Sequence, residues 1–298
     1  MTQRGFDFRR GRSTAVTCAA PVTRLAAGRR ARQDACAPKK HETRLSQFDL
    51  SSDIAVVTGA SSGLGAHFAR LLAANGAKVA LLARRLDLAA GIAREIEVAG
   101  GEALALAADI THADDLTRAI ATVEARWSAP SLLVNNAGIA HHETALDLAE
   151  ADWDRVMETN LKGAFLASQV LARHWVAAKA GGNIVNIASI LGIRVAGRAL
   201  PYAVSKAGLI QMTRALALEW ARHGIRVNAL APGYILTDLN KDFFATPAGA
   251  ELVKRIPQRR MGALADLDGP LLLLASSASA YMTGAVIPVD GGHLNSGL

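Results

Sequence analysis

The stretch of sequence that decides the fold is residues 54–65, IAVVTGASSGLG. Residues 54–58 form an apolar run of the length of a β-strand, and three glycines follow within residues 59–65. From Phe68 the apolar residues recur at helical spacing up to Gly76. Glycines let the chain turn sharply and approach a pyrophosphate without a clashing Cβ, and the helix that follows offers unpaired N–H groups. This order favours a phosphate-binding turn over an ordinary glycine-rich turn.

From about Asp53 to the end of the chain, short apolar runs alternate with longer amphipathic stretches. Residues 86–99, for example, have helical spacing and are closed by Gly100 and Gly101. The apolar runs are nearly continuous, as strands of a parallel sheet covered on both faces must be. The alternation predicts one doubly wound α/β domain without an internal repeat. The further predicted strands are residues 78–83, 103–108, 132–135, 183–187 and 226–230.

The positive charge of the chain is confined to its first fifty residues. The formal net charge is +7 at pH 7. Residues 1–50 hold 11 Lys or Arg and 4 Asp or Glu, whereas residues 51–298 hold 22 of each. A basic face on the folded body, the mark of a nucleic-acid-binding protein, is therefore not expected. About half of the residues are apolar and a fifth are charged, which is the profile of a globular protein.

We predict that residues 1–48 form a basic, disordered N-terminal extension. They are rich in Arg and poor in acidic residues, as a mitochondrial transit peptide is, and a stretch translated from a misassigned start is a further alternative. A nucleic-acid-binding arm would need aromatic residues between its basic ones. Both cysteines, Cys18 and Cys36, lie in this extension. The domain after it therefore has no disulfide framework and no cysteine-based zinc site, which is compatible with a cytoplasmic location.

Neither a membrane nor a metal ion is expected as a partner. No run of residues approaches the roughly 18–20 apolar residues needed to span a bilayer. No cluster of carboxylates and histidines has the spacing of metal ligands.

Tyr202 and Lys206 are four residues apart in the stretch 202–206, YAVSK. On a helix they lie on one face, one turn from each other, and Pro201 suits the first turn of such a helix. A phenol with a pKa near 10 is a poor proton carrier at neutral pH. A nearby ammonium favours the phenolate and lowers that pKa, as general acid–base catalysis requires. The pair alone is common on surface helices, so its meaning depends on the other motifs.

Four motifs follow one another in the order and at the spacing of a known family. They are T-G-x-x-x-G-x-G at residues 58–65, N-N-A-G at 135–138, Ser189 after the apolar run 183–187, and Y-x-x-x-K at 202–206. Together they resemble the short-chain dehydrogenase/reductase (SDR) family, and the resemblance extends over about residues 50–298. It implies an oxidoreductase whose catalytic domain, residues 49–298, is a single Rossmann-type doubly wound α/β domain. Its mainly parallel sheet is expected to have seven strands.

The resemblance implies four catalytic residues, Asn160, Ser189, Tyr202 and Lys206. Tyr202 exchanges a proton with the substrate oxygen, and the Ser189 hydroxyl holds that oxygen and stabilises its negative charge. Lys206 binds the nicotinamide ribose and tunes Tyr202, and Asn160 holds a water on the proton path. By themselves, Ser189 would be interpreted as a turn residue and Asn160 as a helical Asn that bonds its own backbone. The hydride moves between C4 of the nicotinamide and a carbonyl or carbinol carbon.

The end of the second predicted strand indicates which dinucleotide is preferred. NAD-dependent enzymes usually place a carboxylate there to accept from the ribose 2′-OH. Here Ala83 takes that place, and Arg84 and Arg85 follow. A guanidinium can bind a 2′-phosphate in a bidentate manner, so NADP(H) is favoured and NAD(H) is left open. Arg84 is the expected contact, and the alternative is an arginine on a solvated loop.

The other predicted cofactor-binding residues also follow strands, where an open α/β sheet forms its crevice. The resemblance implies that Asp109 contacts the adenine. It also implies that the loop 232–237 closes over the nicotinamide, with the Ile235 backbone and the Thr237 hydroxyl at the carboxamide. The complete predicted set is Gly59, Ser61, Ser62, Gly63, Leu64, Gly65, Arg84, Asp109, Asn136, Ala137, Gly138, Tyr202, Lys206, Pro232, Gly233, Ile235 and Thr237.

Two segments, residues 190–200 and 240–261, are expected to wall the substrate site. The second segment contains an apolar group and a basic group, which are Phe243, Phe244 and Leu252, and Arg255, Arg259 and Arg260. An apolar lid with basic neighbours would suit a β-keto acyl thioester that bears phosphates. Alternatively, the two phenylalanines pack the lid on the core and the arginines are solvated. His141 and His142 could reach the pocket, although loop histidines are usually just exposed.

Three functions are compatible with these motifs. The leading hypothesis is NADPH-dependent reduction of a ketone or a 3-oxoacyl thioester, as in 3-oxoacyl-carrier-protein reductases. The alternative is an NAD(P)-dependent sugar or secondary-alcohol dehydrogenase. A dinucleotide-binding sensor without turnover is disfavoured, because Ser189, Tyr202 and Lys206 are all present. The resemblance further implies a small carbonyl or alcohol as substrate, and a homotetramer or homodimer assembled through the helices that contain Asn160 and Tyr202.

Overall fold

Seven parallel strands form a single sheet in the described part of the computed structural model, which comprises residues 48–237, 241–244 and 246–296. The strand order is β3-β2-β1-β4-β5-β6-β7, and every neighbouring pair is parallel. The strands are β1 (Ile54–Thr58), β2 (Lys78–Ala83), β3 (Glu102–Ala107), β4 (Leu132–Asn135), β5 (Gly182–Ile187), β6 (Ile225–Pro232) and β7 (Val286–Val289). The order reverses between β1 and β4, which is where a doubly wound sheet opens a binding crevice. The predicted fold is confirmed.

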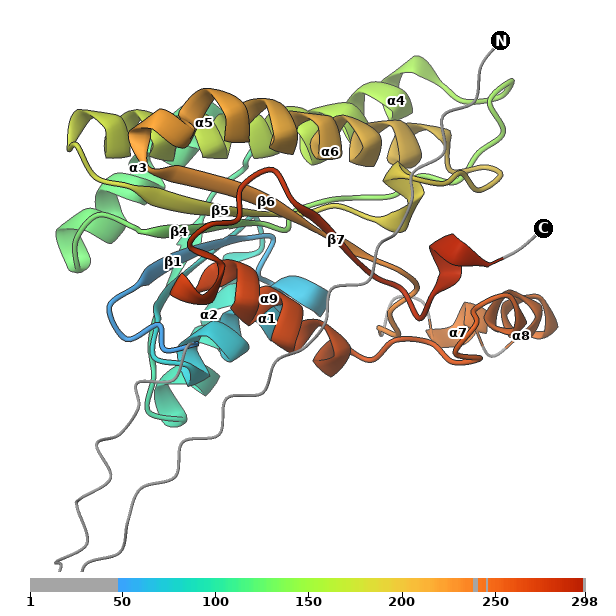
Figure 1. Cartoon of the computed structure of the whole chain (residues 1–298), viewed down its shortest axis with the longest axis horizontal. Helices are drawn as coiled ribbons and strands as arrows, with labels where there is room; N and C mark the ends of the chain where they lie inside the picture. Colours follow the sequence, from blue (N-terminus) through green and yellow to red (C-terminus); the bar gives the residue numbers. More distant parts are fainter. Residues whose placement is uncertain (1–47, 238–240, 245, 297–298) are drawn as a thin grey trace, which may run out of the picture. The chain divides into compact units, whose positions relative to one another are not determined.

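Helices cover both faces of this sheet. Figure 1 shows α1, α2 and α9 on one face and α3, α5 and α6 on the other. Their bounds are α1 (Gly63–Ala74), α2 (Leu86–Val98), α3 (Ala113–Arg126), α4 (Glu150–Met157), α5 (Gly163–Ala177), α6 (Leu200–Trp220), α7 (Lys241–Phe244), α8 (Pro247–Lys254) and α9 (Asp268–Ala275). A π-helical turn, η1 (Glu158–Lys162), joins α4 to α5, and short 3-10 turns include η2 (Ile190–Gly192), η3 (Ala221–His223) and η6 (His293–Asn295).

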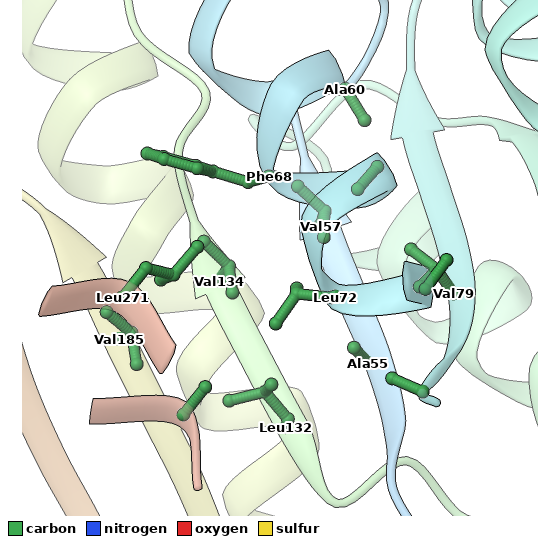
Figure 2. Close-up of a cluster of buried hydrophobic side chains, with 14 of the residues drawn as sticks. Ala55, Val57, Ala60, Phe68, Leu72, Val79, Leu132, Val134, Val185 and Leu271 are labelled. Atoms are coloured by element: carbon green, nitrogen blue, oxygen red, sulfur yellow. The ribbon is translucent and has the colours of Figure 1, made fainter. Parts of the chain in front are cut away.

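The strand β1 shows why the apolar runs are continuous. All five of its residues are buried, and successive side chains of a strand point to opposite faces. Ala55 and Val57 pack in the cluster under α1 and α9, together with Phe68 (Figure 2). Ile54 and Val56 pack in the cluster on the other face. Both clusters fix the position of β1, and hence of the glycine-rich turn that follows it.

Several element boundaries differ from the sequence-based expectation, most of them by one residue. The strand β3 begins one residue earlier than expected, because Glu102 pairs with Lys78 both in the sheet register and through a 3.0 Å ion pair. The strand β6 continues to Pro232, because its end pairs with Val289 of β7. The helix α1 already begins at Gly63, since its first turn consists mostly of small residues that show no apolar periodicity.

The N-terminal extension predicted for residues 1–48 falls almost entirely on residues 1–47, which lie outside the described residues. Within the described ranges, no helix combines the length and the apolar character that a bilayer crossing requires.

Removing the Phe68 ring tests the core that supports the turn. Phe68 is fully buried, and the substitution Phe68→Ala is expected to lower the free energy of unfolding by about 3–5 kcal/mol, because the cavity can close only in part. Urea denaturation measures this loss. The control Val98→Ala, at a side chain that is 90% exposed, should change the free energy by less than about 0.5 kcal/mol. A loss below about 1 kcal/mol for Phe68→Ala would contradict this view of the core.

Candidate active site

A cleft of about 570 Å³ lies at the carboxyl ends of the strands. Every predicted cofactor-binding residue except Gly65 lines it, and so does the predicted catalytic Ser189. Asn160 is the predicted catalytic residue that does not line it. Lining residues that the sequence reasoning did not select are Leu82, Ala83, Arg85, Ala108, Ile110, Ile139, Ala140, Thr159, Ile187, Ala188 and Tyr234. The structure thus brings together residues from Gly59 to Thr237, which are 178 positions apart in the chain.

The glycine-rich turn is shaped by close backbone approaches. Gly59 and Gly63 have φ values of +66° and +55°, in the left-handed region that favours glycine. A Cβ on Gly59 would lie 2.7 Å from the Cα of Ala137. A Cβ on Gly65 would lie 2.4 Å from the carbonyl oxygen of Gly59, so Gly65 serves the packing of the turn and does not line the cleft. A Cβ on Gly63 would meet nothing within 4 Å, so the turn is open there.

The start of α1 fits a bound pyrophosphate. Ser62 is the N-cap residue, its side chain caps no backbone N–H, and the first turn holds no acidic residue. The first N–H groups of a helix lack partners within the helix, and they carry the positive end of its dipole. Gly63 and Leu64, in that first turn, line the cleft. An anion of the size of a phosphate can therefore approach these N–H groups without a competing side chain.

Two arginines follow β2 and reach different parts of the cleft. The Arg85 guanidinium donates to the hydroxyls of Ser61 and Ser62, at 3.1 Å each. Burial raises the pKa of the Asp109 carboxyl, but hydrogen bonds from Thr111 and the charge of Arg84 outweigh it and lower that pKa overall. The sequence reasoning selected Arg84 and missed Arg85. No local signal distinguishes the two arginines, because the acceptors of the Arg85 guanidinium, Ser61 and Ser62, lie more than twenty residues earlier in the chain.

Ser189, Tyr202 and Lys206 meet in the same cleft. The Lys206 ammonium donates to the carbonyl oxygen of Ile187 at 2.7 Å and lies 5.7 Å from the centre of the Tyr202 ring. Burial lowers the pKa of Lys206 to about 8. Burial also raises the pKa of Tyr202, and the hydrogen bond with Ser189 opposes this rise without cancelling it. The expected lowering of the Tyr202 pKa is thus not produced by the protein alone, because desolvation of the phenol outweighs its neighbours.

Asn160 is buried on the π-helical turn η1 and acts on a neighbouring loop. Its side-chain amide accepts from the backbone N–H of Ile139 and donates to the Ile139 carbonyl, at 2.8 Å each, and it also donates to Ser205 at 3.0 Å. It therefore ties the loop after β4 to α6 instead of bonding its own helix. Single π-helical turns are frequent at functional sites. The role of Asn160 in holding a water stays a prediction.

The substrate side of the cleft is walled by the loop after β6. The Tyr234 ring lies 5.8 Å from the Phe244 ring, centre to centre, and 5.6 Å from the His293 ring. Phe244 thus packs on Tyr234 of this loop, whereas the simpler alternative expected both phenylalanines to pack on the core. The side chain of Phe243 and residues 238–240 and 245 lie outside the described residues.

Other residues considered from the sequence lie away from the cleft lining. His141 is 3.6 Å from Asp152, and neither His141 nor His142 lines the cleft. Arg260 forms an ion pair with Asp266. Among the described residues, no group of three or more His, Cys, Asp or Glu side chains has the geometry of a metal site.

The fold and this cleft define an oxidoreductase built for a dinucleotide, and comparison with known proteins gives its family. Residues 59–293 match the family model described as enoyl-(acyl carrier protein) reductase. The 2-dehydro-3-deoxy-D-gluconate 5-dehydrogenase of Escherichia coli (strain K12) is 40% identical over 84% of this chain and 98% of its own length. The 3-oxoacyl-[acyl-carrier-protein] reductase of Synechocystis sp. is 37% identical over 82% of this chain and 97% of its own length.

A solved structure supports the same relationship. The gluconate 5-dehydrogenase of Burkholderia cenocepacia J2315, in complex with NADP and tartrate, superposes with a TM-score of 0.81 at 36% identity, over 85% of this chain and 99% of its own. The chain belongs to the short-chain dehydrogenase/reductase family. It is an NAD(P)-dependent oxidoreductase that acts on alcohol or carbonyl groups.

Lys206 should make the stability of the protein depend on pH. Its pKa is about 8 in the fold and 10.5 ordinarily, so between these values the unfolded chain holds a proton that the folded protein has released. The free energy of unfolding therefore rises with pH in this window. Lys206→Met removes the titrating group. Between pH 7.5 and pH 10, the wild type should gain about 2 kcal/mol of unfolding free energy relative to Lys206→Met. Urea denaturation without dinucleotide measures it, and a constant difference would contradict the shifted pKa.

Proposed function

We propose that this protein is an NADP(H)-dependent dehydrogenase that oxidises a secondary hydroxyl of a sugar, sugar acid or polyol to a ketone, and reduces the ketone in the reverse direction. The observation that carries this proposal is the cluster of Ser189, Tyr202 and Lys206 in one cleft with the glycine-rich turn. The substrate class is supported by the named relatives that act on gluconate derivatives. A homotetramer or homodimer, as the family resemblance implies, and a cytoplasmic location, with which the absence of Cys from residues 49–298 is compatible, belong to the same proposal.

The chain's own residues handle the oxygen and its proton. Tyr202 accepts the hydroxyl proton in oxidation and returns it to the carbonyl oxygen in reduction, and Ser189 holds that oxygen by a hydrogen bond. Lys206 holds the ribose and keeps a positive charge beside the phenol. The bound nicotinamide accepts or supplies the hydride. Because burial keeps the Tyr202 pKa high, the phenol is ready to donate at neutral pH, and oxidation is expected to gain from alkaline pH.

The remaining predicted residues hold the dinucleotide in this proposal. The glycine-rich turn and the start of α1 take the pyrophosphate, Asp109 lies at the adenine, and the loop 232–237 lies at the nicotinamide. Arg84 and Arg85 are proposed to bind the 2′-phosphate together, since both line the cleft and Arg85 is anchored beside the turn. No carboxylate follows β2 directly, which is consistent with a preference for NADP(H) over NAD(H).

Removing either arginine should separate the two dinucleotides. Arg84→Ala and Arg85→Ala are each expected to lower kcat/KM for NADP⁺ by about 10-fold or more, because each removes a charge-assisted hydrogen bond to the phosphate. The value for NAD⁺ should stay within about 2-fold, since NAD⁺ has no 2′-phosphate. Arg94→Ala, on the exposed side of α2, is the matched control. An equal loss with both dinucleotides, or a wild type that prefers NAD⁺, would contradict the assignment.

The activity itself is tested by absorbance at 340 nm. We expect the purified protein to reduce NADP⁺ with a panel of aldonates, sugars and polyols. Tyr202→Phe should lower kcat at least about 100-fold while dinucleotide binding persists, because it removes only the proton-transferring hydroxyl. The 3-oxoacyl-[acyl-carrier-protein] reductase among the relatives favours a second candidate, so acetoacetyl thioester with NADPH is included. Turnover of the thioester alone would replace the sugar proposal with the acyl one.

A further inference from the structure

Tyr234 occupies a place between the catalytic residues and the outer wall of the site. It lines the cleft that contains Ser189 and Tyr202, and it is close enough to Tyr202 for their charges to interact. On its other side its ring lies against Phe244 and His293. Tyr234 therefore connects the catalytic end of the cleft to His293.

Two arginines stand beside His293. Arg194, just after η2, donates to the His293 carbonyl oxygen at 2.6 Å and to the Ser296 hydroxyl at 3.1 Å. Arg255 follows the last residue of α8, is exposed and does not line the cleft. The next residue, Ile256, lines a smaller pocket together with Tyr234, and the Arg255 charge acts on both Tyr234 and His293. Burial, and then the charge of Arg194, lower the pKa of His293, and Arg255 adds to this against the opposing charge of Asp290. Two arginine charges thus act on this wall, and the Asp290 carboxylate opposes them.

The carboxylates near this wall already have hydrogen-bond or ion-pair partners. Asp290 accepts from the backbone N–H groups of Gly292 and Leu294, at 2.9 and 2.7 Å. Glu251, one turn before Arg255, forms an ion pair with Lys254 at 2.6 Å. Among the described residues, no carboxylate lies within ion-pair distance of Arg255, and the Arg255 charge makes only a minor contribution to lowering the pKa of Glu251.

The neighbouring arginines behave differently. Arg198 pairs with Glu143 at 3.1 Å, and Arg260 pairs with Asp266 at 2.5 Å. Arg194 is held by neutral oxygens of the C-terminal segment, with one Nη atom engaged. Arg255 alone among these four arginines presents a guanidinium without a described hydrogen-bond acceptor for its side chain. A planar guanidinium in this state matches the two oxygens of one carboxylate.

We propose that the substrate carries a carboxylate and that Arg255 binds it, which would make Arg255 a specificity-determining residue and the substrate a sugar acid. This inference rests on the proposed function. The reacting hydroxyl lies at Ser189 and Tyr202, and the carbon chain passes Tyr234 toward Arg255. A phosphate would be expected to collect several donors, whereas a single uncommitted guanidinium suits a carboxylate. A neutral polyol of the same length gains nothing from Arg255.

Matched pairs of an aldonate and an alditol test the proposal, because the aldonate carries a carboxylate where the alditol carries a hydroxymethyl group. D-gluconate with D-glucitol and D-xylonate with xylitol are oxidised with NADP⁺, and D-glucitol 6-phosphate tests a phosphate in place of the carboxylate. We expect the wild type to prefer the aldonate of at least one pair by 10-fold or more in kcat/KM. Arg255→Gln should lower kcat/KM for that aldonate by about 10- to 100-fold, mainly through KM, and leave its alditol within about 2-fold. Arg255→Lys should restore part of the loss.

Arg222→Gln is the matched control, because Arg222 lies beyond the far end of α6, about 30 Å along the helix from Tyr202. It should change none of these values.

Three outcomes would overturn the carboxylate assignment and leave the dehydrogenase proposal standing. They are an equal loss for both members of a pair in Arg255→Gln, no loss in that variant, or a preference for the sugar phosphate. If no sugar acid or polyol is turned over, the proposed function fails. In that case, the binding of D-gluconate to the protein with NADP⁺ is measured by calorimetry. Binding that Arg255→Gln weakens by about 10-fold or more would support a carboxylate site at Arg255. Unchanged binding, or no binding at all, would overturn it.

Discussion

The hydrogen bonds that join the end of β1 to the loop after β4 are the constraint on which the site depends. The Thr58 hydroxyl oxygen accepts from the backbone N–H groups of Asn136 and Ala137 at 3.1 Å each, and the Asn136 amide donates to the Thr58 carbonyl oxygen at 3.0 Å. These two strands are the pair at which the strand order reverses. The loops that follow them therefore diverge, and the crevice between them is the floor of the dinucleotide cleft.

A second polar network holds the catalytic helix. Asn135 donates to the side chain of Asn186 at 2.9 Å, and Asn186 donates to Thr213 of α6, also at 2.9 Å. All three side chains are buried, so leaving any of them unpaired would be costly, and the network fixes α6 relative to β4 and β5. Tyr202 and Lys206 thus stand on a helix that is tied to the sheet, and the hydrogen bond from Asn160 to Ser205 ties the same helix to η1. Rigid elements, not loops, position the proton-transferring group.

The fold and most of the cleft could be predicted because their signals are local. The strand–turn–helix at residues 54–65 and the spacing of Tyr202 and Lys206 each lie within one or two elements, and parallel strands necessarily bring their ends together. Arg85 and Arg255 could not be selected in this way. Their significance depends on which neutral or charged atoms surround a guanidinium, and residues distant in the chain supply those atoms. The π-helical turn at Asn160 has no apolar periodicity of its own, so it was not expected either.

Burial shifts the pKa values of Tyr202 and Lys206 so that the charged form of each depends on the charge of the other. It raises the pKa of the Tyr202 phenol and lowers the pKa of the Lys206 ammonium to about 8, so each group alone resists its charged form. When the phenol loses its proton, the new negative charge lies beside the ammonium and stabilises it, and the ammonium stabilises the phenolate to the same extent. Proton transfer at Tyr202 is therefore a property of the pair. An oxidation that needs the phenolate proceeds well only while Lys206 keeps its proton, so the lowered pKa of Lys206 limits how far alkaline pH can accelerate it.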